Sequence, residues 1–206
     1  MIEIEVDIRA QGRPVRDQGR RLTCLAHAFS GAHEIALGDG LYRSPEYLHW
    51  FTPAGSFGGA AAALRDRGQP EEAACPYLAA DPGREWRPQR SETMRRDHAL
   101  LQPSASAVFT VLKAGWPAIL GLSIPRSFLS VTAPWIITAP GVALARHAVV
   151  AVGLGRGGAE PAILIRNSWG EAWADRGHAW VSETFLAQHL HDAAVLHPEV
   201  FLGDFH

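Results

Sequence analysis

Cys24 stands where a polar loop runs into an apolar stretch with helical spacing, and Thr23 before it is a typical helix N-cap. A helix N-terminus carries partial positive charge and unpaired N–H groups, so it favours the thiolate form of a cysteine. His147 can serve as the base for such a thiol, and Asn167 can orient the imidazole. The amide of Gln18 can donate to a developing oxyanion. A nucleophile, a base and an orienting amide in this chain order indicate a cysteine–histidine hydrolase.

Each of these residues has a simpler explanation when it is taken alone. A single cysteine on an apolar helix is usually a buried structural residue, and a single histidine is usually a hydrogen-bonded core residue. His27 lies one helical turn after Cys24, so a Cys/His metal pair is conceivable. No further ligand motif accompanies that pair, and we expect no metal site. Taken together, the nucleophile, base and two amides favour catalysis over these simpler explanations.

Three sequence blocks carry a resemblance to a known family. Gln18-Gly19, followed by Cys24-Leu25-Ala26, matches the pattern Gln-Gly-x-x-x-x-Cys-x-Ala. His147-Ala148 matches a His-Ala block, and the segment from Asn167 to Gly170 matches Asn-Ser-Trp-Gly residue for residue. In these blocks and their order the chain resembles the papain-like cysteine peptidases, and specifically a bacterial-type member without a pro-segment.

Weaker matches extend the resemblance over nearly the whole chain. Val6-Asp7-Ile8-Arg9 resembles the start of the family's mature domain, and Cys75-Pro76-Tyr77 resembles its Tyr-Pro-Tyr segment. Gly58-Gly59 resembles the segment that pairs with the substrate backbone. Because the chain begins where a mature domain would begin, either the gene is short or a larger protein has been shortened.

The resemblance implies an α+β, papain-like two-lobe fold with the active-site cleft between the lobes. We expect residues 1–206 to form a single peptidase domain. Its helical lobe would cover residues from about 10 to 103, and its β-barrel-like lobe would cover those from about 104 to 206 together with the N-terminal strand. The resemblance also implies an acyl-enzyme on Cys24, with His147 as general base and acid, and no cofactor.

The resemblance further implies a cleft that binds an extended peptide. Gly58-Gly59 would offer an exposed backbone edge to the substrate. Small side chains at Ala61 and Ala145 would line a roomy apolar pocket. Trp169 would border the substrate and shield the hydrogen bond between the base and its orienting amide from water, although core packing explains this residue equally well.

Several positions depart from the family pattern. Leu25 follows the nucleophile where the family usually has Trp, and Arg21 stands where secreted relatives typically have a cysteine. Arg146 precedes His147, where many relatives have Asp or Asn. A cation beside the base disfavours imidazolium, so we expect the thiolate–imidazolium pair to persist over a narrower pH range on its upper side.

Hydrophobic and turn patterns place helices in the first half of the chain and strands in the second, which is an α+β pattern. Helices are expected over 24–37, 45–51, 60–67, 106–113 and 182–191, with one short helix near 92–101 in an otherwise irregular stretch from 70 to 103. Strands are expected over 1–10, 117–124, 147–154, 161–167, 178–181 and 199–202, and a long loop over 128–142.

Composition limits the partners. The chain has 206 residues, a formal net charge of −2 and no basic tract, which argues against nucleic acid and against an electrostatic membrane anchor. No apolar run reaches the length that spans a bilayer. Two cysteines cannot make a disulfide framework, so we expect a reducing, cytoplasmic setting. We expect a peptide or protein substrate, and the sequence leaves the oligomeric state open.

Two alternatives to the peptidase remain open at this point. A transamidase or acyltransferase would keep the fold and the nucleophile but would pass the acyl group to an amine or thiol instead of water. A catalytically inactive peptide-binding module would keep only the lobes. The intact set of nucleophile, base and amides argues against the inactive module, since binding alone does not require all of them.

Overall fold

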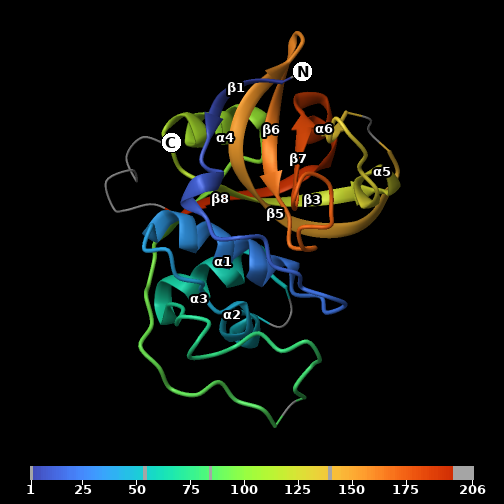
Figure 1. Cartoon of the computed structure of the whole chain (residues 1–206). Helices are drawn as coiled ribbons and strands as arrows, with labels where there is room; N and C mark the ends of the chain where they lie inside the picture. Colours follow the sequence, from blue (N-terminus) through green and yellow to red (C-terminus); the bar gives the residue numbers. More distant parts are fainter. Residues whose placement is uncertain (1, 53–54, 84, 139–140, 197–206) are drawn as a thin grey trace.

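The computed structural model describes residues 2–52, 55–83, 85–138 and 141–196, which form a helical lobe below a β-rich lobe (Figure 1). The elements of the first half are β1 (Ile2–Asp7), the 3₁₀ turn η1 (Arg9–Gln11), α1 (Cys24–Leu37), α2 (Pro45–Phe51), α3 (Phe57–Arg67) and β2 (His98–Leu101). Those of the second half are α4 (Ala105–Lys113), β3 (Ala118–Pro125), α5 (Arg126–Leu129), β4 (Ile136–Ile137), β5 (Ala143–Gly157), β6 (Glu160–Arg166), β7 (His178–Ser182), α6 (Glu183–His189) and β8 (Leu190–Leu196).

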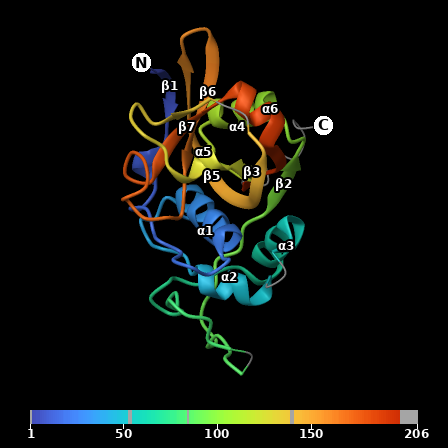
Figure 2. The same ribbon diagram turned by 90° about the vertical axis from the view of Figure 1, so that its right-hand side faces the viewer.

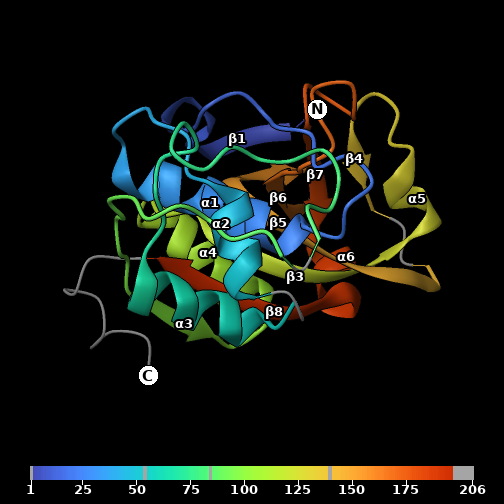
Figure 3. The same ribbon diagram turned by 90° about the horizontal axis from the view of Figure 1, so that it is seen from below.

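Helix α1 is the central element of the helical lobe. It covers the same residues as the helix expected from the sequence, and it ends at Gly38, which adopts the left-handed conformation (φ 66°) and donates to the Glu34 carbonyl. Figures 2 and 3 show α1 between the sheet on one side and α2 and α3 on the other. Helix α2 also has the expected bounds, because the Ser44 hydroxyl accepts the Tyr47 N–H and Pro45 fills the first helical position.

The β-rich lobe is one sheet with the strand order β2-β8-β3-β5-β6-β7-β4, and β1 pairs with β5. Its described pairs are antiparallel except for β4 with β7. Within the described ranges the sheet stays open, so the expected barrel-like lobe is an incompletely closed sheet. Strand β5 is the longest and lies at the centre, where it contacts β1, β3 and β6.

Two hydrophobic cores lie on opposite faces of this sheet. Along β5, Val149 and Ala151 belong to the core that α4 and α6 cover, whereas Val150 and Val152 belong to the core shared with α1. Side chains alternate between the faces of a strand, so one strand supplies both cores. Phe29 of α1 is fully buried in the shared core, and burial of that core joins the two lobes.

Several sequence-based boundaries were wrong. The short helix expected near 92–101 is instead strand β2, which pairs with β8. Helix α3 begins at Phe57 rather than at residue 60, because the Ser56 hydroxyl caps it by accepting the Gly59 N–H. The expected helix over 182–191 ends earlier, at His189, and β8 follows it directly. The strand expected over 199–202 lies outside the described residues.

The other expected strands and the helix over 106–113 appear within a few residues of their predicted places, and β5 extends further in both directions than the strand expected over 147–154. The expected long loop over 128–142 also contains the end of α5 and the short strand β4. Among the described residues, every helix is too short or too polar to cross a membrane.

Replacing Phe29 tests whether the shared core holds the lobes together. Phe29→Ala should lower the free energy of unfolding by about 3–5 kcal/mol, because it opens a cavity where α1 meets the sheet. Urea unfolding measures the loss. Leu100→Ala on β2, where the side chain is 61% exposed, is the control and should cost less than about 1 kcal/mol. Equal losses in the two variants would contradict this account of the core.

Candidate active site

The candidate nucleophile is the first residue of α1. Thr23 holds the N-cap position, but its hydroxyl pairs with the Tyr77 hydroxyl at 2.8 Å, so the expected cap hydrogen bond to a helix N–H is absent. The backbone N–H groups of Ala148 and Leu25 lie near the Cys24 sulfur and act to lower the pKa of the thiol. Burial raises the pKa of the thiol nevertheless, because desolvation of the thiolate outweighs these N–H contacts.

The candidate base comes from the other lobe. His147 lies on β5 opposite Leu122 of β3, and it is 6% exposed. Its Nε2 lies 2.6 Å from Oδ1 of Asn167, and the same oxygen accepts the Ser168 backbone N–H at 2.8 Å. Because this oxygen can only accept, Nε2 carries the ring proton and Nδ1 keeps a lone pair. The free lone pair is the one that a thiol proton needs.

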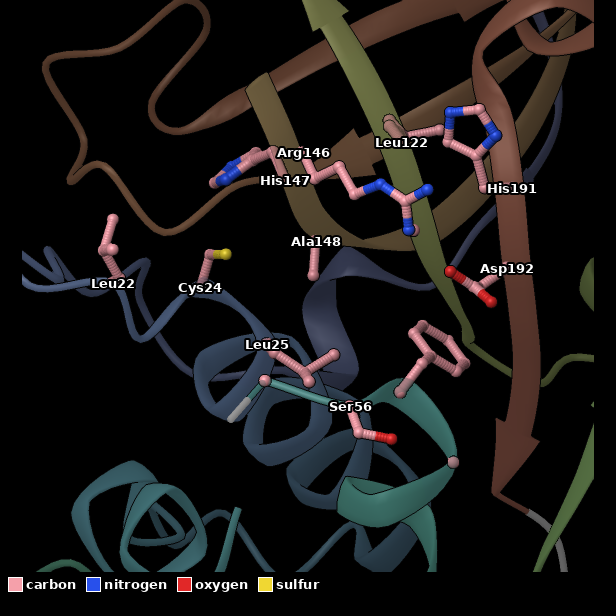
Figure 4. A pocket seen from close by; sticks show the side chains of 14 residues that line it. Leu22, Cys24, Leu25, Ser56, Leu122, Arg146, His147, Ala148, His191 and Asp192 are labelled. Carbon is pink, nitrogen blue, oxygen red and sulfur yellow. The ribbon is translucent and has the colours of Figure 1, made fainter. Parts of the chain in front are cut away.

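Cys24 and His147 line one pocket of about 460 Å³ between the lobes (Figure 4). The sulfur points toward Ala148 in this structure, and among the contacts of the described residues no hydrogen bond joins it to the imidazole. The torsion about the Cα–Cβ bond of Cys24 sets the direction of the sulfur inside the pocket. The fold therefore brings the two groups, which are distant in sequence, into one cleft.

Burial also controls the protonation of the base. Desolvation lowers the pKa of His147 to about 4, and the hydrogen bond to Asn167 offsets only part of this effect. The raised pKa of the thiol and the lowered pKa of the imidazole both favour the neutral forms of these two groups. Arg146 does not contribute to the shift, and its guanidinium extends along the pocket toward Asp192 (Figure 4). The expectation that Arg146 narrows the pH range of the thiolate–imidazolium pair stays a prediction, which a pH–rate profile tests.

Aromatic rings cover the base and its orienting amide. The Trp169 ring lies against the His147 ring, with centroids 4.5 Å apart, and Phe128 meets the imidazole edge-on at 5.9 Å. Trp173 packs edge-on against Trp169 at 5.8 Å and is itself buried. A hydrogen bond kept away from water in this way is stronger than an exposed one. Trp169 is absent from the described pocket wall, so its contact is with the base and not with the pocket.

Gln18 is held between the two lobes. Its side-chain oxygen accepts the Ser168 hydroxyl at 2.6 Å, its side-chain nitrogen donates to the Arg21 carbonyl at 2.8 Å, and its backbone N–H donates to the Ser168 carbonyl. The side chain is 6% exposed and is absent from the described pocket wall. An amide nitrogen carries two N–H groups, so one remains after the bond to Arg21.

Sequence reasoning missed the residues that fix the loop before the nucleophile. The Arg21 guanidinium forms a two-point ion pair with Glu46 of α2 and also donates to the Leu78 carbonyl at 2.7 Å. Tyr77 lies under this guanidinium and donates to the Gln18 carbonyl at 2.8 Å. The departure from the family at Arg21 was visible in the sequence, but nothing there indicated Glu46 as its partner.

The described pocket wall combines small, apolar and charged residues: Leu22, Cys24, Leu25, Gly55, Ser56, Phe57, Gly58, Gly121, Leu122, Arg146, His147, Ala148, His191 and Asp192. The charged side chains of Arg146 and Asp192 lie at the end away from Cys24 (Figure 4). Sequence reasoning had not assigned Asp192 or His191 to the site, because β8 was not expected.

The predicted substrate edge at Gly58-Gly59 is helical in the structure and not an extended strand. Both residues lie in the first turn of α3, and the Gly59 N–H is bonded to the Ser56 hydroxyl at 3.2 Å. Gly58 lies on the pocket wall and Gly59 does not. The irregular backbone that borders the pocket is at Gly55, where φ is +66° and only glycine avoids strain.

The predicted pocket residues Ala61 and Ala145 both lie outside the described pocket wall. Ala61 is fully buried in the core between α3 and α1, so it faces away from any substrate. Ala145 is exposed on β5 and lies outside the described wall. Neither position could be assigned by local pattern, because the pocket is formed where α1, α3, β3, β5 and β8 converge.

Among the described residues, no cluster of His, Cys, Asp and Glu is arranged to hold a metal ion.

Comparison with known proteins places this geometry in a family. A model of the papain family of cysteine proteases matches residues 62–194. The chain belongs to the papain family of cysteine proteases. A sequence search of curated proteins finds no match.

Solved structures agree on the fold. Xylellain, a cysteine protease from Xylella fastidiosa, aligns with a TM-score of 0.78 at 19% identity, over 96% of this chain and 87% of its own. Procathepsin L 3 from the larval midgut of Tenebrio molitor aligns with a TM-score of 0.77 at 18% identity, over 94% of this chain and 69% of its own. The Carica candamarcensis cysteine protease CMS1MS2, in complex with E-64, aligns with a TM-score of 0.74 at 21% identity, over 93% of this chain and 97% of its own. The expected papain-like α+β fold is thus confirmed.

Buried neutral histidines should make this papain-family protein sensitive to mild acid. Burial lowers the pKa of His27 to about 3 and those of His33, His147 and His178 to about 4, from an ordinary value of 6.5. Between these values the unfolded chain binds more protons than the folded one. The free energy of unfolding should therefore fall as the pH drops from 6.5 toward 4, by up to about 1.4 kcal/mol per pH unit for each histidine.

Urea unfolding at stepwise lower pH measures this slope. Burial raises the pKa of Glu34, which acts in the opposite direction and offsets part of the loss. His33→Gln removes one of the buried imidazoles and should give a shallower slope than the wild type. A stability that stays constant or rises between pH 6.5 and 4.5 would show that these histidines are not held neutral.

Proposed function

We propose that this papain-family cysteine peptidase hydrolyses peptide bonds through an acyl-enzyme on Cys24, with His147 as general base and then general acid. The observation that supports this most strongly is the buried 2.6 Å contact between His147 Nε2 and Asn167 Oδ1. It leaves Nδ1 as the available acceptor in a ring that shares a pocket with the only thiol on the described pocket wall.

The first half of the reaction forms the acyl-enzyme. As the Cys24 sulfur attacks the peptide carbonyl, Nδ1 of His147 takes the thiol proton and the carbonyl electrons move to oxygen. The backbone N–H of Cys24 and the remaining side-chain N–H of Gln18 stabilise this oxyanion. The imidazolium then gives its proton to the amide nitrogen, the C–N bond breaks, and the amine leaves.

The second half releases the acyl group. Water gives a proton to Nδ1 of His147 and attacks the thioester carbonyl, and the tetrahedral intermediate expels the Cys24 sulfur. The proton returns to the sulfur, which restores the neutral resting pair. Throughout both halves, Asn167 keeps the imidazole in one orientation, and Trp169 keeps their hydrogen bond dry.

The pocket supports a substrate with one long side chain near the scissile bond. Leu25, Phe57 and Leu122 supply apolar walls, and Ala148 leaves room beside Cys24. Asp192 lies at the far end, and no ion pair or hydrogen bond to its carboxylate is described. A lysine or arginine side chain can pack its methylenes on the apolar walls and place its cation at Asp192.

The remaining sequence-based expectations stand as part of the proposal. The substrate is a peptide or protein, with no nucleic acid or membrane involved. Cys24 and Cys75 are both free thiols, which supports a reducing, cytoplasmic setting.

Trapping with a peptidyl electrophile tests the catalytic assignment. The wild type should be alkylated at Cys24, and His147→Ala should react at least about 100-fold more slowly because no base remains to take the thiol proton. Peptide mass spectrometry locates the adduct. His191→Ala, which removes an exposed histidine from the same pocket, is the matched control and should react like the wild type.

Two results would contradict the assignment: equal labelling of wild type and His147→Ala, or an adduct on Cys75. Turnover of a fluorogenic peptide with and without an added amine then separates hydrolysis from acyl transfer. An inactive binding module would show neither labelling nor turnover.

Charge at the far end of the pocket should set substrate preference. Asp192→Asn should lower kcat/KM about tenfold or more for peptides with lysine or arginine in this pocket, because a charge-assisted hydrogen bond contributes about 1.5–3 kcal/mol. Peptides with leucine there should be little affected. Arg146→Ala removes the opposing cation on the same wall and should raise kcat/KM for the basic peptides. An unchanged preference in both variants would remove the proposed role of Asp192.

A further inference from the structure

A second, small cavity lies beside Asn167, the residue that orients the candidate base. It measures about 10 Å³ and lies where α1, β5 and the segment after β6 meet. His27 of α1 and Asn167 both contribute to its wall, and each has a buried polar atom without a partner among the described residues: Nε2 of His27 and Nδ2 of Asn167. Unpaired buried polar atoms are costly, so two of them at one cavity call for an explanation.

The two unpaired atoms have complementary roles. Nδ1 of His27 lies 3.0 Å from the Thr23 carbonyl oxygen, which can only accept, so Nδ1 carries the proton and Nε2 is an acceptor. The ring is 4% exposed and stays neutral, because burial lowers the pKa of His27 to about 3. On Asn167, Oδ1 already accepts from His147 and Ser168, so Nδ2 is a donor with no partner. One atom offers a lone pair and the other offers a proton.

We propose that this cavity binds one water molecule, which accepts from Nδ2 of Asn167 and donates to Nε2 of His27, and that His27 is thereby a positioning residue for the catalytic pair. The cavity has about the volume of one water, and a buried water needs at least two polar partners. A water bridge of this kind is nearly as favourable as a direct hydrogen bond.

The bridge selects one orientation of the Asn167 amide. A flipped amide would place its NH₂ group against two donors, the Nε2–H of His147 and the backbone N–H of Ser168, and its oxygen toward the cavity. The water, held by the acceptor on His27, gives the NH₂ group a partner only in the unflipped orientation. It therefore supports the His147 tautomer that leaves Nδ1 free.

The bridge also joins the nucleophile helix to the other lobe. His27 lies on the first turns of α1, one turn beyond Cys24, and its ring is fixed edge-on against Tyr77, with centroids 4.7 Å apart. Its backbone N–H and its Nδ1 both bond to the Thr23 carbonyl. A ring held on both sides in this way can transmit the position of α1 to the amide that orients the base.

A crystal structure of the wild type at high resolution tests the water directly. We expect a density peak within hydrogen-bonding distance of both Nε2 of His27 and Nδ2 of Asn167. The absence of such a peak would overturn the proposal. This inference rests on the proposed function, but the two fail separately: labelling at Cys24 without a water peak removes only the bridge, and a water peak without labelling removes the catalytic role.

Variants of His27 test its positioning role. His27→Phe keeps the ring and its contact with Tyr77 but removes the acceptor, so kcat should fall about three- to tenfold while KM changes less than about twofold. The NMR signal of the His147 Nε2–H should broaden or shift, because the amide that holds it is less fixed. His27→Gln restores an acceptor and should recover part of kcat.

His33→Phe is the matched control. His33 is also fully buried on α1, and its Nε2 also lacks a described partner, but its Nδ1 bonds to Gln69, away from the site. This variant should lose stability and keep both kcat and the His147 signal. An equal loss of kcat in the two phenylalanine variants, or an unchanged kcat and signal in His27→Phe, would overturn the positioning role.

Discussion

The buried hydrogen bond between His147 and Asn167 is the interaction on which the site depends. It fixes which imidazole nitrogen carries the proton, and it holds the ring where the pocket meets the nucleophile helix. The strength of this hydrogen bond depends on the exclusion of water. Trp169 and Phe128 exclude water by packing against the imidazole. The same burial lowers the pKa of His147 to about 4, which favours the neutral ring that the proposed transfer of the thiol proton requires.

A base in one lobe and a nucleophile in the other can cooperate only if the lobes are held in register. The buried core between α1 and the sheet restrains the lobes, because one face of β5 packs directly on α1. Near the site, hydrogen bonds and an ion pair add to this restraint between the lobes. Gln18 joins Ser168 of one lobe to the loop of the other, and Arg21 fixes that loop on Glu46 by a buried two-point ion pair. Breaking such a pair from one side is costly, because the remaining charge stays buried.

The sequence predicted the parts of this structure that local chemistry decides. Helices α1 and α2 were predicted with their bounds because glycine, serine and proline stand at their ends. The motifs identified Cys24, His147, Asn167 and Gln18, and the fold brings all of them to one region.

Helix α3 was misread because the glycine pair suggested an extended edge, whereas Ser56 caps a helix there. Strand β8 was missed because its partners, β2 and β3, are distant in sequence. The wall of the described pocket could not be read from the sequence for the same reason, because Asp192 lies on β8 and Ala61 lies in the core shared with α1.

In the proposed reaction, the sulfur of Cys24 carries the acyl group during turnover. Rapid acid quenching of the enzyme with a slowly hydrolysed peptide ester, followed by peptide mass spectrometry, would measure this directly. We predict an adduct of the acyl mass on the peptide that contains Cys24, which appears before product and disappears when the substrate is consumed. Turnover with no adduct on that peptide, or with the acyl group on another residue, would contradict the account.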